Sequence, residues 1–138
     1  MEDFRSFIYN KCVDFSIRIS KLYSFLSNEK KEFVFSKQIL RSGTSIGANL
    51  AEAQYGISKN DFLAKVYISL KETAETMYWL EVLHKAGFIS DKQYQSMMED
   101  SEELKRLFMS ITKKTKESLK TPNSQLPTPN SQLLTSNS

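Results

Sequence analysis

The sequence has few of the residues that form covalent crosslinks or metal centres. It contains one cysteine, Cys12, so no intrachain disulfide can form, and we expect a reducing, cytoplasmic location. Its one histidine, His84, forms a Glu-x-x-His pair with Glu81, but a di-iron bundle needs two such pairs and two further glutamates. We therefore expect no metal ion and no cofactor. His84 is interpreted as a helix-end residue near the negative end of the helix dipole.

Proline and glycine are scarce as well. All three prolines lie beyond residue 121, and the chain has four glycines, so little opposes helix between residues 4 and 120. Long apolar runs are absent too. The longest uncharged stretch of this part, residues 42–51, is about half the length of a membrane span. No apolar run follows a basic start, so we expect neither a signal peptide nor a membrane partner.

Apolar residues recur at intervals of three and four along four segments, which predicts four amphipathic helices. The expected helices cover residues 4–26, 28–55, 58–87 and 90–119. Their similar lengths and short connections predict an all-α fold, an antiparallel up-down-up-down four-helix bundle over residues 1–120. The predicted stripe of the first helix consists of Phe4, Ile8, Cys12, Phe15, Ile19, Leu22 and Leu26. The predicted stripe of the third helix consists of Phe62, Val66, Ser69, Thr73, Met77, Leu80 and His84. Cys12 is accordingly predicted to be a core residue.

The helix ends are predicted from local signals. Asn28 is expected to cap the second helix, and Gly56 to end it in the left-handed conformation. Two pairs have the spacing of a capping box at the start of a helix: Ser58 with Asp61, and Ser90 with Gln93.

The C-terminal segment, residues 121–138, has a different composition. TPNSQLP, TPNSQLL and TSNS repeat with a period of seven and carry no charge. Seven is also the coiled-coil period, but the prolines exclude a continuous helix. We predict a disordered, low-complexity tail.

The second helix carries two unusual faces. Gly43, Gly47 and Ala51 form a face of small residues, which lets another helix approach closely, either in the same bundle or across a subunit boundary. The third helix is apolar nearly all round near its end, at Tyr78 and Trp79. One bundle would leave part of this surface in water, so we assign all five residues to oligomer contacts.

The other unusual face of the second helix is polar, and its residues recur every three or four positions: Arg41, Ser45, Asn49 and Glu52. Glu72 and Glu75 of the third helix are expected to face it. We interpret this row, with Glu72, as a hydrogen-bonded network that fixes helix register or a subunit interface. The alternative is acid–base catalysis by Glu52 and Glu72. No catalytic histidine, cysteine or serine–base pair accompanies these carboxylates, and we predict no enzymatic activity.

Basic residues gather near two helix ends, at Lys30, Lys31 and Lys37, and at Lys113, Lys114 and Lys116. The formal net charge of +3 is modest for a nucleic-acid-binding protein. We consider both groups as nucleic-acid contacts, against the alternative that they are ordinary solvated lysines.

The second segment resembles the signature of the bacterial four-helix bundle proteins also called 23S rRNA intervening-sequence proteins, in the run Gln38-x-x-Arg41-Ser42-x-x-Ser45-Ile46-x-x-Asn49-Leu50-Ala51-Glu52. The likeness extends over about residues 4–119 and includes Ser69-Leu70-Lys71-Glu72 and Gly87-Phe88-Ile89. Residues Ala53-Gln54 depart from the pattern common in that family.

The resemblance implies an antiparallel bundle that assembles into a homopentamer around a central channel, with no established enzymatic activity. A related branch, the accessory proteins of diversity-generating retroelements, forms basic pentamers that bind nucleic acid and reverse transcriptase. We therefore expect a homo-oligomer, a pentamer by resemblance, that binds RNA or a nucleic-acid-handling protein. The alternative is a structural or adaptor protein without nucleic-acid affinity.

Overall fold

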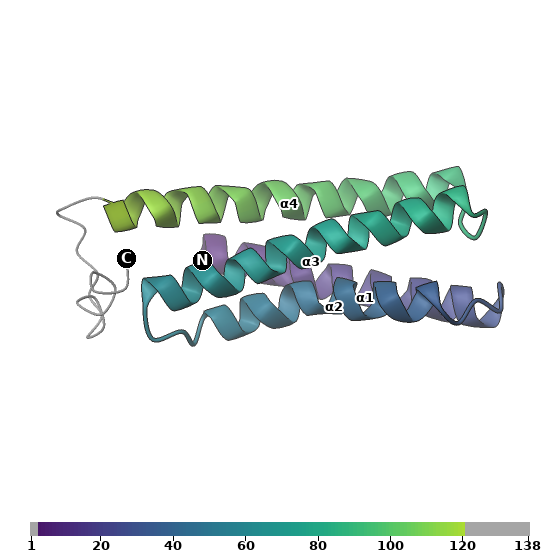
Figure 1. Ribbon diagram of the computed structural model, residues 1–138, viewed down its shortest axis with the longest axis horizontal. Coiled ribbons are helices and arrows are strands. Elements are labelled where there is room, and N and C mark those ends of the chain that lie inside the picture. The colour runs from purple at the N-terminus through teal and green to yellow at the C-terminus, as the bar shows by residue number, and fades with distance from the viewer. Residues whose placement is uncertain (1–2, 121–138) are drawn as a thin grey trace.

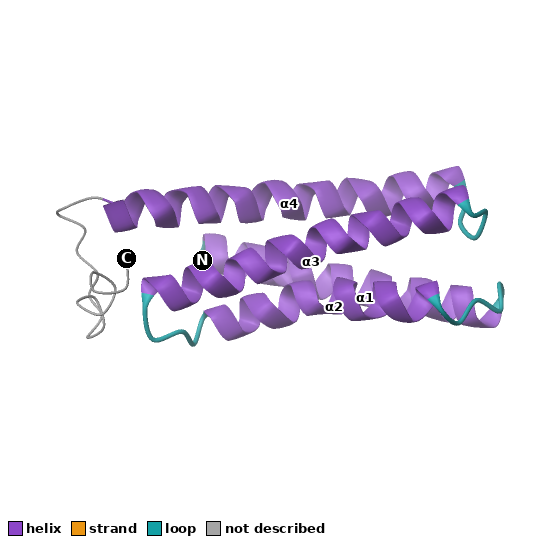
Figure 2. Ribbon diagram, viewed as in Figure 1, coloured by secondary structure: helices purple, strands orange, loops and turns teal. Residues whose placement is uncertain are grey.

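The computed structural model describes residues 3–120, and within that range it contains four helices and no strand. The helices are α1 (Phe4–Asn28), α2 (Phe35–Ala53), α3 (Lys59–Lys85) and α4 (Asp91–Lys120). Short loops join them (Figure 2), and each helix runs opposite to the one before it (Figure 1). The predicted four-helix bundle is confirmed. None of these helices combines the length and apolar character of a membrane span. The predicted tail lies outside the described residues.

The core is built from the apolar stripes that the sequence predicts. Six side chains of α1 are buried, and all six belong to its predicted stripe: Ile8, Cys12, Phe15, Ile19, Leu22 and Leu26. Burial raises the pKa of the Cys12 thiol to about 12, because a thiolate there would lose its hydration. Cys12 is therefore a core residue, as predicted, and an unreactive one.

The buried face of α3 differs from its predicted stripe. Thr76 and Leu83 are buried, whereas Met77 and His84, which were placed on the stripe, are only partly buried. The structure instead buries Thr76 against α2, where its hydroxyl donates to the Glu72 carbonyl at 2.8 Å and pairs with the Ser42 hydroxyl, also at 2.8 Å.

Two glycines let α1 and α2 approach closely. A Cβ atom on Gly43 would lie 2.7 Å from Cγ1 of Ile19, and one on Gly47 would lie 3.0 Å from Cβ of Cys12. Both separations are shorter than ordinary van der Waals contacts. The face of small residues on α2 therefore packs against α1 of the same chain at these two positions.

Several predicted helix ends are confirmed and two are wrong. The Ser90–Gln93 capping box forms, with two hydrogen bonds exchanged, and at the start of α3 the Ser58 hydroxyl caps the helix by accepting from the Asp61 amide. Asn28, however, ends α1 and does not cap α2. Gly56 is not left-handed. The described residues with positive φ are Lys31, at 54°, and Gly87, at 86°, which ends α3 as predicted.

A buried glutamate, Glu32, caps α2. Its carboxylate accepts from the amides of Val34 and Phe35, each at 2.9 Å, and from that of Ser36 at 2.7 Å. These amides have no partner inside the helix, so a charged acceptor there stabilises the helix start. Burial acts to raise the pKa of the Glu32 carboxyl, but the hydrogen bonds from Phe35, Ser36 and Val34 outweigh burial and hold that pKa below its usual value.

The variant Glu32→Gln tests this cap. At neutral pH we expect it to lower the free energy of unfolding by about 1–2 kcal/mol, because a neutral amide replaces a charged acceptor. The pKa of the Glu32 carboxyl is lower in the folded than in the unfolded state, so the stabilisation that the carboxylate contributes is complete above the unfolded-state pKa. It is lost as the pH falls through the folded-state pKa. Urea unfolding followed by circular dichroism at neutral pH and at about pH 3 measures this. A difference between the two proteins that stays constant with pH would contradict the assignment.

Candidate functional site

The predicted polar row and its facing carboxylates meet partly, around Arg41 on α2. Its guanidinium donates to Glu75 at 2.6 Å and to Glu72 at 3.2 Å, both on α3. The indole N–H of Trp79 also donates to Glu75, at 3.0 Å. Hydrogen bonds from Arg41 and Trp79 lower the pKa of the Glu75 carboxyl. The second oxygen of Glu72, Oε1, is buried without a hydrogen-bond partner among the described residues. We call these four residues the Arg41 cluster.

The rest of the row does not join the Arg41 cluster. The Ser45 hydroxyl donates to the carbonyl of Arg41, and the Asn49 amide donates to that of Ser45, so both side chains bond to their own helix. Glu52 is exposed and pairs with Lys65 at 2.7 Å. Glu52 and Glu72 therefore occupy separate ion pairs with different cations, which argues against their acting as a catalytic pair.

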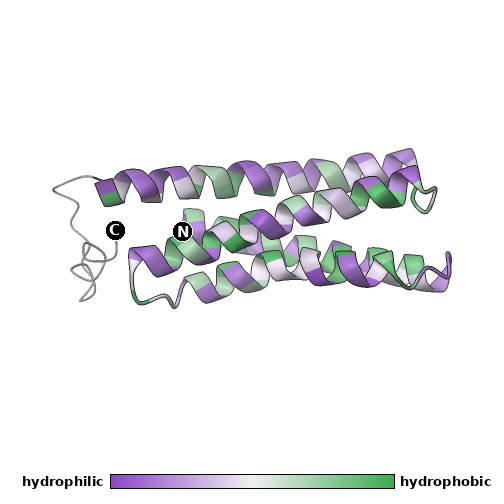
Figure 3. Cartoon of the chain, viewed as in Figure 1, coloured by the Kyte–Doolittle hydropathy of each residue, from purple (hydrophilic) through white to green (hydrophobic). Residues whose placement is uncertain are grey.

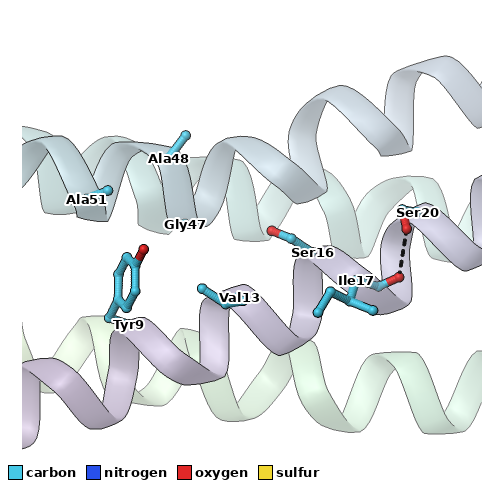
Figure 4. A pocket seen from close by; sticks show the side chains of 8 residues that line it. All are labelled: Tyr9, Val13, Ser16, Ile17, Ser20, Gly47, Ala48 and Ala51. Atoms are coloured by element: carbon cyan, nitrogen blue, oxygen red, sulfur yellow. Dashed lines mark hydrogen bonds between the residues drawn. The ribbon is translucent and has the colours of Figure 1, made fainter.

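The face of α1 that points away from the core forms an uncharged groove with α2. Tyr9, Val13 and Ile17 lie at successive turns of this helix and are 39%, 40% and 48% exposed. The groove has a volume of about 440 Å³ and is lined by eight residues without formal charge: Tyr9, Val13, Ser16, Ile17, Ser20, Gly47, Ala48 and Ala51. Figure 4 shows these side chains of α1 beside the small residues of α2.

Two of the five predicted oligomer contacts line this groove, and the other three lie elsewhere in the bundle. Gly47 and Ala51 line the groove, but Gly43 is buried beneath Ile19. On α3, Trp79 packs into the bundle, with its ring stacked on Phe35 at 5.9 Å between centroids. Tyr78 is 58% exposed and lies edge-on against Trp79.

The two predicted lysine groups lie at opposite ends of the bundle. Lys30, Lys31 and Lys37 are in or near the α1–α2 loop, whereas Lys113, Lys114 and Lys116 lie at the far end, where α4 finishes close to the start of α1 (Figure 1). One protomer therefore does not combine them into a single patch.

Charge is strongly separated along α4. Residues 91–103 carry five acids and one lysine, and residues 104–120 carry six basic residues and one glutamate. Figure 3 shows how hydrophilic this helix is along its length. Five exposed cations follow one outer face at helical spacing, and we call them the basic stripe: Lys105, Arg106, Lys113, Lys116 and Lys120. The sequence prediction missed Lys105 and Arg106. Following the helical period backward from Lys113 would have found both.

The comparisons with known proteins place the chain in a family. A family model described as 23S rRNA-intervening sequence protein matches residues 5–110. The chain belongs to that family. A solved structure from Bacteroides thetaiotaomicron VPI-5482, described as a protein of unknown function from the S23 ribosomal protein family, is 50% identical. The alignment covers 80% of this chain and 99% of that one, with a TM-score of 0.79. No match is found among curated proteins.

The family resemblance inferred from the second helix is thus confirmed, and the structure shows where the segment that carries it packs. Within the span of the signature of the 23S rRNA-intervening sequence proteins, Ser42 is buried against α3, and Gly47, at one of its unspecified positions, packs against Cys12 of α1. Arg41 forms the cluster with α3. The signature therefore describes mainly how α2 packs between its two neighbours.

Two variants separate the Arg41 cluster from the rest of the polar row. Arg41→Gln removes the counter-charge of Glu72 and Glu75, and we expect it to lower the free energy of unfolding by about 1–2 kcal/mol. Glu52→Gln removes an exposed ion pair and should cost less than about 0.5 kcal/mol. Urea unfolding followed by Trp79 fluorescence measures both. Equal losses would mean that the cluster stabilises the fold no more than a surface pair does.

Proposed function

We propose that this family member is a non-enzymatic homo-oligomer that binds RNA through the basic end of α4. The observation that carries the proposal is the pair of contrasting surfaces on one small bundle. One is the uncharged groove of α1 and α2, and the other is the basic stripe of α4. They lie on different helices, so one surface is available for self-association while the other faces a polyanion.

A second copy of the chain is the occupant that we propose for the groove. Exposed apolar side chains on three successive turns of α1, beside a floor of glycine and alanine, suit the close approach of another helix. The uncharged lining favours an apolar partner surface over a charged one. The family resemblance implies five protomers, arranged in a ring.

RNA is the ligand that we propose for the basic stripe. The family name connects these proteins with ribosomal RNA, and phosphate binding strengthens with every charge that is neutralised. No ion pair joins Lys105, Arg106 or Lys113 to an acid within residues 3–120, so these cations are available to phosphates. An oligomer would repeat the stripe in every protomer, which raises the effective local concentration of binding sites.

The surroundings of the thiol and of two carboxylates support the proposal that the protein is not an enzyme. The Cys12 thiol is buried with a raised pKa, so it is a poor nucleophile. The most densely hydrogen-bonded carboxylates, Glu32 and Glu75, are held by a helix start and by an arginine. Both therefore have structural partners that explain their positions.

Light scattering tests self-association. The variant Ile17→Glu places a carboxylate in the groove, and we expect it to convert an oligomeric protein into a folded monomer, because burying an unpaired charge is costly. Val34→Glu is the matched control, since Val34 is 67% exposed in the α1–α2 loop and lies outside the groove. Circular dichroism checks that both variants are folded. A wild-type protein that stays monomeric at micromolar concentration would contradict the proposal.

A salt series tests RNA binding. The triple variant Arg106→Gln, Lys113→Gln, Lys116→Gln should weaken binding of rRNA fragments by roughly tenfold or more and reduce the slope of log K against log salt by about 2. The triple variant Lys30→Gln, Lys31→Gln, Lys37→Gln removes the same charge from the opposite end and should bind nearly as the wild type does. Filter binding measures both. Equal losses would show a general charge effect, and no binding at low salt would exclude the RNA function.

A further inference from the structure

Two phenylalanines at the start of α1 lie exposed beside the basic end of α4. Phe4 is 43% exposed and Phe7 is 40% exposed. The ammonium group of Lys114 lies 5.1 Å from the centre of the Phe4 ring, and that of Lys11 lies 5.3 Å from the centre of the Phe7 ring. The sequence pattern placed Phe4 on the core stripe. The bundle leaves it at the surface, where its ring adds little to the core.

Both phenylalanines lie on the side of α1 that faces α4. Two ion pairs identify this side: Lys11 with Glu103 at 3.2 Å, and Arg18 with Asp100 at 2.5 Å. Phe4, Phe7 and Lys11 follow each other at intervals of three and four, so their side chains share one face of the helix. The uncharged groove is on another face of α1, which Tyr9 and Val13 occupy.

A single strand of nucleic acid has the chemistry that this surface would recognise. Its bases present flat apolar faces, which stack on aromatic rings, and its phosphates require cations nearby. A duplex hides those faces inside its own stack and would use only the cations. Each exposed ring has an ammonium group beside it, Lys114 of α4 at Phe4 and Lys11 of α1 at Phe7, and this combination favours a single strand.

We propose that Phe4 and Phe7 stack bases of single-stranded RNA, whose phosphates lie along Lys114 and the basic stripe. This inference rests on the proposed RNA function and adds the class of RNA. The acidic part of α4, residues 91–103, repels phosphates, and its last residue, Glu103, pairs with Lys11 beside Phe7. The phosphates are therefore expected on the Phe4 side of the two rings, toward Lys114. Because the groove lies on a different face of α1, RNA and a second protomer can bind at the same time.

Fluorescence anisotropy with two labelled probes tests this inference on the full chain. One probe is oligouridine of about 15 nucleotides, near the upper range of known single-strand sites, and the other is an RNA duplex of similar length. The double variant Phe4→Leu, Phe7→Leu should bind oligouridine about tenfold more weakly or worse, with an unchanged salt slope. Its binding of duplex should stay within about twofold of the wild type.

Three controls make the result specific. Tyr55→Leu removes an aromatic side chain that is 88% exposed in the α2–α3 loop, and it should bind both probes as the wild type does. Phe4→Tyr, Phe7→Tyr retains both rings and should retain the affinity for oligouridine. Thermal unfolding followed by circular dichroism confirms that the leucine variant is folded. If it were not, the comparison would use each single leucine variant.

The outcomes distinguish this inference from the function on which it rests. Equal affinity of wild type and leucine variant for oligouridine would overturn the stacking role, and salt-dependent binding of either probe would leave the RNA function standing. Wild-type protein that binds the duplex but not oligouridine would also overturn the stacking role and leave the RNA function standing. Wild-type protein that binds neither probe at low salt would overturn both.

Discussion

The close approach of α1 and α2 is the constraint on which the rest of the bundle depends. Gly43 and Gly47 leave no room for a Cβ atom between the two helices, since Ile19 and Cys12 occupy that space. With the two helices this close, α1 buries its core stripe from Ile8 to Leu26 and turns Tyr9, Val13 and Ile17 outward. The uncharged groove is therefore a direct consequence of the glycine contacts. A larger residue at either glycine would move α1 outward and change the core and the groove together.

The packing of α3 on α2 depends on a second kind of contact, because hydroxyl groups are buried there. The Ser69 hydroxyl donates to the carbonyl of Ile46 at 2.8 Å, and Thr76 pairs with Ser42. Each such group must keep its partner, since an unpaired buried hydroxyl is costly. A shift of α3 along α2 would break these bonds, so they favour one register. In that register Arg41 lies above Glu72 and Glu75, which makes the Arg41 cluster a surface continuation of the same interface.

The sequence carries enough information to predict the four helices and their buried faces. Every buried residue of α1 repeats at helical spacing and is apolar, so periodicity alone identifies it. Periodicity was less informative for α3, because Thr76 is buried by a hydrogen bond to Ser42, which only the packing of α3 on α2 supplies. The α1–α2 loop could not be read locally either. Lys31 takes the left-handed conformation that glycine usually adopts, and the cap of α2 comes from Glu32, three residues before the helix.

The candidate site was predicted less completely, because helical spacing tells which residues share a face but not which partners they find. Arg41 reaches across to α3, as expected from its neighbours there. Ser45 and Asn49 share its face, yet their short side chains bond back to the α2 backbone. Glu52, one turn further, meets Lys65 instead. One sequence pattern thus divides into an interhelical cluster, two local bonds and a surface pair.

The charge separation along α4 links the two parts of the proposed function. If protomers packed head to tail through this helix, the basic half of one α4 would face the acidic half of the next, and little positive charge would remain for phosphates. If all protomers point the same way around a ring, every basic end lies at one rim, and the acidic halves lie at the other. Like charges at that rim repel, so the contacts that hold such a ring must come from an uncharged surface. The groove of α1 and α2 has this character, and it lies on a different face of α1 from the residues that meet α4. An assembly through the groove therefore leaves the basic rim open to RNA.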